Sequence, residues 1–187
     1  KVASAEELGL AWDRTLQGLE ALPGVKGVAA ADWLPVTPGS GPWNTLSRPG
    51  SGEGETQGQA PGRRKFVNRD YFRVLGIPLL AGRGFDRGDR DGSGPVAVVS
   101  ESLAQRLWPG QSALGRRFEM SVRRKPDPVS CQVVGIAGDI REDGFDRPTE
   151  PMIYIPFFQE PQSLGSILVE TGGQPLGMAP ELRKALR

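Results

Sequence analysis

The strongest fold signal in the chain lies in residues 67–83, which read VNRDYFRVLGIPLLAGR. Asn68 is a favourable N-cap residue and predicts a short helix over residues 69–75. Gly76 follows at the position where a helix commonly ends in a left-handed backbone conformation. Residues 77–80 (IPLL) then predict an edge strand, because the proline cannot donate a ladder hydrogen bond.

Strand and helix signals alternate downstream of this stretch. Residues 95–99 (PVAVV) predict a strand that ends at Ser100, which is a good N-cap for a helix through Leu107. Further strands are expected at residues 116–122, 131–137, 152–158 and 166–170, and a last helix at residues 178–187.

Upstream, Ser4 and Glu7 have the spacing of a capping box, in which both residues satisfy free backbone N–H groups at a helix start. Apolar residues recur at helical spacing over residues 8–22, and a Pro-Gly pair at residues 23–24 ends the helix. Residues 25–34 predict a strand. The chain therefore begins with a helix that has one apolar face, followed by a strand.

The composition changes in residues 35–62, which are rich in glycine, proline and serine. We expect a loop or loose hairpin here without a core of its own, in which residues 43–46 can form a short strand. The alternating strands and helices, with hairpins, indicate an α+β fold. Two lobes are expected, with boundaries and short hinges near residues 35–62 and near residues 143–151.

Composition limits the function. The 187 residues include 23 Lys and Arg against 22 Asp and Glu, a net charge of +1, so no nucleic-acid partner is expected. The chain has no histidine, which excludes Ser-His-Asp and Cys-His nucleophile pairs and His-based zinc sites. Cys131 is the single cysteine, so no intrachain disulfide forms. We expect no catalytic residue, no cofactor and no metal.

The ends of the chain suggest a fragment. No apolar run approaches the ~20 residues of a membrane span. The chain also lacks a signal segment with a charged start and an apolar middle, and it begins at Lys1 rather than at methionine. We therefore expect it to be a piece of a longer protein.

Short motifs recur in an order and spacing typical of one family. They are LPGV (22–25), residues 67–83, VAVVSESLA (96–104), WPG (108–110), LGRR (114–117), VVGIAGDIR (133–141) and PMIYIP (151–156). From Leu22 to Pro156 the chain resembles the MacB-like periplasmic core domain of ABC-transporter permeases, in the MacB/FtsX-like family. The ends of the chain match more loosely.

This resemblance implies a fold with a βα-type, porter-like lobe and an inserted, mainly-β lobe. We assign residues 1–34 and 144–187 to the first lobe, 63–143 to the second, and 35–62 to a Gly/Pro-rich connection. The family also implies a strand before the first helix and another after the last, each leading into a membrane helix.

The implied function is non-catalytic. A cytoplasmic ATP-binding subunit or domain would move transmembrane helices, and this domain would transmit that motion on the periplasmic side of the inner membrane. The recipient would be a substrate or partner protein, in export, lipoprotein release or partner activation. The resemblance also implies a second permease copy, as a dimer or pseudo-dimer.

An alternative function rests on the acidic residues Asp139, Glu142, Asp143 and Asp146. Paired carboxylates carry out glycoside hydrolysis, so a secreted hydrolase or carbohydrate-binding domain is the second hypothesis. The four residues crowd one loop, whereas catalytic pairs usually face each other across a cleft. A charged turn is therefore the favoured interpretation.

Each of the other local patterns has a structural interpretation and a functional one. Residues 89–94 (DRDGSG) resemble the start of a calcium loop, but the twelfth position is Ser100 rather than glutamate, which favours a solvated turn. The glycines of residues 82–84 and 135–138 lack the forms of nucleotide-binding loops. Basic clusters are interpreted as solvated strand ends, with phospholipid or nucleic-acid contact as alternatives. These clusters are residues 63–65, 116–117 and 123–125.

Three tryptophans are possible contacts for a substrate or partner. Trp108 is expected in the core. Trp43, within the Gly/Pro-rich segment, and Trp33 are the candidate partner-contact residues, because an exposed aromatic side chain often marks an interaction site.

Overall fold

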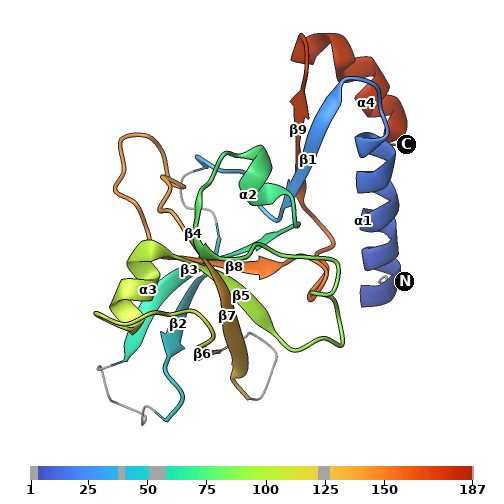
Figure 1. Cartoon of the computed structure of the whole chain (residues 1–187). Helices are drawn as coiled ribbons and strands as arrows, with labels where there is room; N and C mark the ends of the chain where they lie inside the picture. Colours follow the sequence, from blue (N-terminus) through green and yellow to red (C-terminus); the bar gives the residue numbers. More distant parts are fainter. Residues whose placement is uncertain (1–3, 38–40, 51–57, 122–126, 187) are drawn as a thin grey trace.

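The computed structural model describes residues 4–37, 41–50, 58–121 and 127–186. Helices and strands are mixed along this part of the chain, so the α+β prediction is confirmed (Figure 1). In chain order the elements are α1 (Ala5–Glu20), β1 (Val25–Ala31), β2 (Trp43–Ser47), β3 (Gln59–Val67), α2 (Tyr71–Val74), β4 (Leu79–Gly82), β5 (Val96–Ser100), α3 (Glu101–Leu107), β6 (Arg117–Met120), β7 (Val129–Ala137), β8 (Met152–Pro156), β9 (Ser166–Thr171), the 3₁₀ helix η1 (Pro175–Met178) and α4 (Ala179–Ala185).

The helix-start signals are confirmed. The Ser4 hydroxyl accepts a hydrogen bond from the Glu7 N–H at 3.1 Å, and the Glu7 carboxylate accepts one from the Ser4 N–H at 2.7 Å. The Ser100 hydroxyl accepts from the Leu103 N–H at 3.4 Å and so caps α3. Each cap satisfies backbone donors that the first helical turn leaves free.

Six strands pair into a closed ring, which we call the barrel. The neighbours are β2, β6, β7, β5, β8 and β3 in this order, and β3 pairs again with β2. All six strands contribute side chains to one buried cluster, among them Leu46 of β2, Phe118 of β6 and Ile153 of β8. Leu103 and Leu107 of α3 pack into the same cluster. The barrel interior is therefore the main core of the described chain.

The stretch 67–83 covers the outside of the barrel. Tyr71 and Phe72 of α2 pack against Tyr154 of β8, with ring centroids 6.0 and 5.0 Å apart respectively. Within the described chain β4 pairs with β7 alone, which confirms the predicted edge strand at Leu79 and Leu80. Burial of three aromatic rings in one contact explains why this stretch carries so strong a fold signal.

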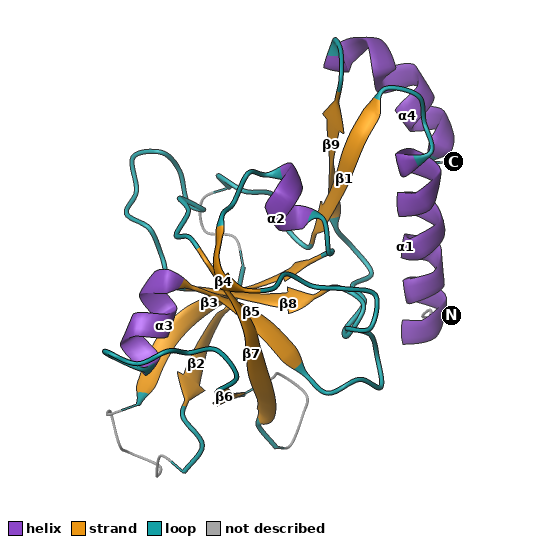
Figure 2. Cartoon of the chain, viewed as in Figure 1, coloured by secondary structure: helices purple, strands orange, loops and turns teal. Residues whose placement is uncertain are grey.

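A second region, which we call the arm, consists of α1, β1, β9, η1 and α4. It stands beside the barrel in Figure 2. β1 and β9 pair antiparallel, and Leu16 and Leu19 of α1 pack on Val28 and Ala30 of β1. Leu182 of α4 packs against the same small cluster.

The structure bears on two expectations, for residues 35–62 and for the segment 144–187. Residues 35–62 were expected to have no core of their own, and Leu46 of β2 is fully buried in the shared core of the barrel, because β2 pairs on both sides. The hairpin in this segment is confirmed, since β2 pairs with β3. β8 belongs to the segment 144–187 assigned to the first lobe, and it lies between β3 and β5 in the barrel. The two-lobe boundaries and hinges stay a prediction.

Candidate functional site

The strand pairing that joins the arm to the barrel, which we call the joint, is short. β1 meets β3 at a single paired position, Ala31 opposite Val67. Asn68 extends this contact. Its side-chain oxygen accepts from the Ala30 N–H at 3.0 Å, and its side-chain amide donates to the Val28 carbonyl at 2.8 Å. One buried side chain thus replaces the next step of a β-ladder.

The expectation that Asn68 caps a helix is wrong. Asp70 holds the N-cap position of α2 and makes no side-chain capping bond. The Asn68 amide is buried and is already committed to the backbone of β1. Buried backbone groups need hydrogen-bond partners, and a cap at the exposed start of a four-residue helix has less effect on stability.

Asp32 supports the other end of the same joint. Its carboxylate accepts from the Phe66 N–H at 3.1 Å, and its own N–H donates to the Phe66 carbonyl at 3.2 Å. Burial raises the pKa of Asp32 to about 6, although the Phe66 N–H and the charges of Lys65 and Arg64 oppose this. The joint therefore contains a carboxyl group that titrates near neutral pH.

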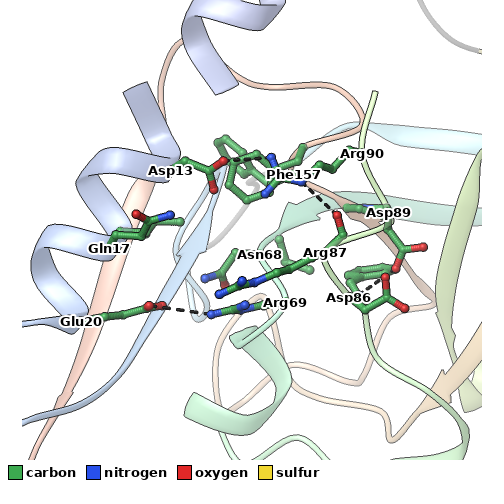
Figure 3. Close-up of a pocket in the computed structure, with 15 residues that line it drawn as sticks. Asp13, Gln17, Glu20, Asn68, Arg69, Asp86, Arg87, Asp89, Arg90 and Phe157 are labelled. Carbon is green, nitrogen blue, oxygen red and sulfur yellow. Dashed lines mark hydrogen bonds and ion pairs between the residues drawn. The ribbon is translucent and has the colours of Figure 1, made fainter. Parts of the chain in front are cut away.

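A cleft lies beside the joint, between α1 and the segments that follow β3 and β4. Figure 3 shows its walls, which enclose a cavity of about 120 Å³. Asp13 of α1 pairs with Arg90 at 2.9 Å, and Glu20 of α1 pairs with Arg69 at 3.8 Å. These partly exposed ion pairs connect arm and barrel, and each contributes only ~0–1 kcal/mol because water screens it. Neither ion pair is recognisable in the sequence, since the two partners of each pair lie far apart along the chain.

Asp89, from the calcium-like stretch, lies in the same wall but is already paired. Its two oxygens accept from Arg83 at 2.7 and 3.0 Å. Burial opposes ionisation of this carboxyl, but the hydrogen bonds from Arg83 outweigh it and keep the Asp89 pKa below its usual value. Within the described residues no cluster of three or more side chains is arranged to hold a metal ion.

The interpretation of residues 63–65 as solvated strand ends is wrong. Lys65 is fully buried and pairs with buried Glu142 at 2.7 Å. Arg63 is also buried and pairs with Asp143 at 2.7 Å and with Glu150. Burial lowers the Lys65 pKa, and the Glu142 charge opposes that shift. Alternation along β3 directs both cations away from the barrel interior, toward the loop before β8.

Of the other two basic clusters, the structure describes one. Arg116 and Arg117 are exposed, as expected of solvated positions. Residues 123–125 lie outside the described residues.

The acidic loop proposed for hydrolysis forms ion pairs and hydrogen bonds within the fold. Glu142 and Asp143 are paired with Lys65 and Arg63, as described. Asp139 accepts from the Ser102 hydroxyl at 2.6 Å and from the Ser102 N–H at the start of α3. Three of the four carboxylates are therefore held by hydrogen bonds or ion pairs to separate donors of the fold.

The structure brings Trp33 and Trp43 together over one cation. The Arg63 guanidinium lies 5.0 Å from the Trp33 ring and 6.0 Å from the Trp43 ring. Lys65 Nζ lies 3.8 Å from the centroid of the Trp33 ring. Trp43 is 53% exposed, and Trp33 is partly buried. Their role as partner contacts stays a prediction, whereas Trp108 is buried in the core as expected.

Comparison with known proteins identifies the family. The model of the MacB-like periplasmic core domain matches residues 5–175. The chain belongs to this family. A relative named macrolide export ATP-binding/permease protein MacB 1/2, from Paracoccus denitrificans (strain Pd 1222), is 31% identical over 121 residues. That match covers 64% of the chain and 17% of the relative, so the chain spans less than a fifth of its length.

Solved structures with the same fold include the periplasmic region of MacB from Actinobacillus actinomycetemcomitans. It has a TM-score of 0.63 and 18% identity, over 92% of this chain and 71% of that one. The extracellular domain of the noncanonic ABC-type transporter YknZ from Gram-positive bacteria has a TM-score of 0.57 and 19% identity, over 90% and 75%. At these identities the likeness shows the fold alone. None of the helices in the described part of the chain is long and apolar enough to cross a membrane.

Proposed function

We propose that the chain is a non-catalytic, extracytoplasmic domain of an ABC-transporter permease that transmits helix motion to a substrate or partner. ATP would be hydrolysed by a cytoplasmic subunit or domain, and transmembrane helices outside this chain would carry the motion to the arm. The domain would lie on the periplasmic side of the inner membrane, beside a second permease copy. Family membership supports this assignment.

The short joint is the observation that carries the proposal. Transmission needs two bodies that move relative to each other about a short connection. The barrel and the arm share one paired strand position and the hydrogen bonds of Asn68 and Asp32 beside it. Outside the strands they share a ring contact between Trp12 and Phe157 and three partly exposed ion pairs, Asp13–Arg90, Glu20–Arg69 and Glu170–Arg73. The ion pairs are partly exposed and break at little cost in free energy, whereas the short buried contact at Ala31, Val67 and Asn68 would be the connection about which the two bodies move.

The test is a distance measurement in the intact transporter. Spin labels are placed at Arg14→Cys on α1 and Gln105→Cys on α3, both exposed positions, in a background without other reactive cysteines. The control pair, Gln105→Cys with Gln132→Cys, lies wholly on α3 and the barrel. We expect the first distance to differ between nucleotide-free and ATP-bound protein, and the control distance to stay constant. Identical distances in both states, for both pairs, would rule transmission through this joint out.

The same proposal predicts how the partner-contact residues behave. Trp43 is more exposed than Trp33 and borders the buried Arg63 network. If this face docks a partner, Trp43→Ala should weaken docking, with little effect on folding because the side chain is half in solvent.

A further inference from the structure

One end of the barrel opens on an apolar hollow, and we call this end the mouth. Strand ends converge there: the ends of β3, β6 and β8 and the starts of β5 and β7. The hollow measures about 130 Å³. Apolar side chains make its floor, namely Phe66, Pro95, Met120, Val129, Cys131 and Ile155. Mouths of small barrels are common sites for small ligands.

One cation at this mouth lacks a partner. Arg64 lies two positions before Phe66 on β3 and so faces the barrel interior, and its guanidinium carbon is 4.8 Å from the Phe66 ring. Its Nε is buried and donates no hydrogen bond, and no carboxylate of the described residues lies within ion-pair distance. A buried donor without an acceptor costs free energy, so this group calls for an acceptor from outside the chain.

Other charged residues at the mouth affect how strongly an anion binds Arg64. Arg90 is already paired with Asp13 at 2.9 Å. Asp91 and Glu160 also line the mouth, but neither carboxylate forms an ion pair with Arg64. An anion that binds Arg64 lies near these two carboxylates, which weaken its binding.

We propose that the barrel mouth binds a small amphipathic carboxylate, with its apolar tail on the floor and its carboxylate on Arg64. The hollow is slightly smaller than a cavity of about 150 Å³ that accepts benzene, which limits the buried tail to about six carbons. Arg is well suited to the head group, because its guanidinium donates two parallel hydrogen bonds to a carboxylate. This site is independent of the proposed transmission role.

The three methionines provide a built-in test. Met120 lies in the floor, Met152 in the cluster outside the barrel, and Met178 in the arm. With methyl-labelled methionine, titration with hexanoate should shift the Met120 signal to saturation and leave the other two unchanged. Hexan-1-ol, which has the same tail without the charge, should bind at least about tenfold more weakly, as expected for loss of a charge-assisted hydrogen bond.

Two variants act in opposite directions. Arg64→Gln should weaken hexanoate binding about tenfold and leave hexan-1-ol unchanged, whereas Glu160→Gln should strengthen hexanoate binding a few-fold. Unchanged Met152 and Met178 signals show that each variant is folded. If Arg64→Gln does not fold, the hexanoate and hexan-1-ol comparison in the unaltered chain decides. No Met120 shift, equal binding of both compounds, or equal shifts of all three methionines would overturn the proposal.

Discussion

The barrel and the arm differ in how their strands are covered. Each barrel strand pairs on both sides, and β5 and β8 are buried at every residue. In the arm, β9 pairs only with β1 among the described strands, and none of its six residues is fully buried. Stability in a protein follows buried apolar area and paired backbone. The difference indicates that the barrel is the stable body of this domain, while the arm depends on few contacts and on its joint.

The buried ion pair behind the barrel should give the largest effect. Glu142→Ala leaves Lys65 fully buried without its carboxylate, and we expect a loss of about 3–5 kcal/mol in the free energy of unfolding. Glu170→Ala is the matched change in the arm. Glu170 is 42% exposed and pairs with Arg73 at 3.5 Å, so the loss should stay below about 1 kcal/mol. Urea denaturation of both variants measures the two losses, and equal values would remove the contrast between barrel and arm.

Replacing Asn68 should have an intermediate effect on stability, mainly at the joint between arm and barrel. Asn68→Ala leaves the Ala30 N–H and the Val28 carbonyl without partners, at a cost of about 2–3 kcal/mol. Hydrogen exchange should speed up in β1 and β9 more than in β5 and β7. The control is Asn44→Ala, which removes an exposed hydrogen bond to the Ser121 carbonyl and should change exchange little. Equal loss of protection in the arm and the barrel would show that the joint does not separate them.

Asp32 should give an effect that appears only as a pH dependence. Its pKa is about 6 in the folded chain against an ordinary 3.8, so the folded chain binds a proton at a pH where the unfolded chain does not. The free energy of unfolding should therefore gain a contribution as pH falls from about 7 to about 4. Asp32→Asn, which keeps an acceptor for the Phe66 N–H, should lack this contribution.

The Asp32 measurement is a set of denaturation curves between these pH values for the unaltered chain and the variant. Subtracting one set from the other removes the other titrating groups. A difference that does not change with pH would contradict the raised pKa. A slope of the expected sign would show that protonation of Asp32 stabilises the folded chain.

The fold could be predicted from the sequence where the signal is local. The capping residues Ser4 and Ser100 act on backbone groups within three positions, so their helices were placed correctly. The stretch 67–83 also identified the family, because its motifs keep their order and spacing. The candidate site could not be predicted in the same way. Asp13 and Arg90 are 77 positions apart, and nothing in either neighbourhood indicates the other.

Charge gave the least reliable sequence signal. Arg63 and Lys65 stand in a basic run that is typical of a solvated strand end, yet both are buried. Their carboxylate partners come from a loop about 80 positions later, which looked like an exposed acidic turn. Burial of a charge depends on an opposite charge being brought within a few ångströms, and only the folded chain decides that.

The sequence by itself determined the starts of α1 and α3, the mixture of helices and strands, and membership of the family, since caps and strand patterns act over a few neighbouring residues. Only the tertiary structure decided that β2 closes the ring, that Asn68 continues a ladder rather than capping a helix, and that Arg64 has no ion-pair partner among the described residues. These features depend on pairs of residues distant in sequence, whose meeting is a property of the packed core and of no single segment.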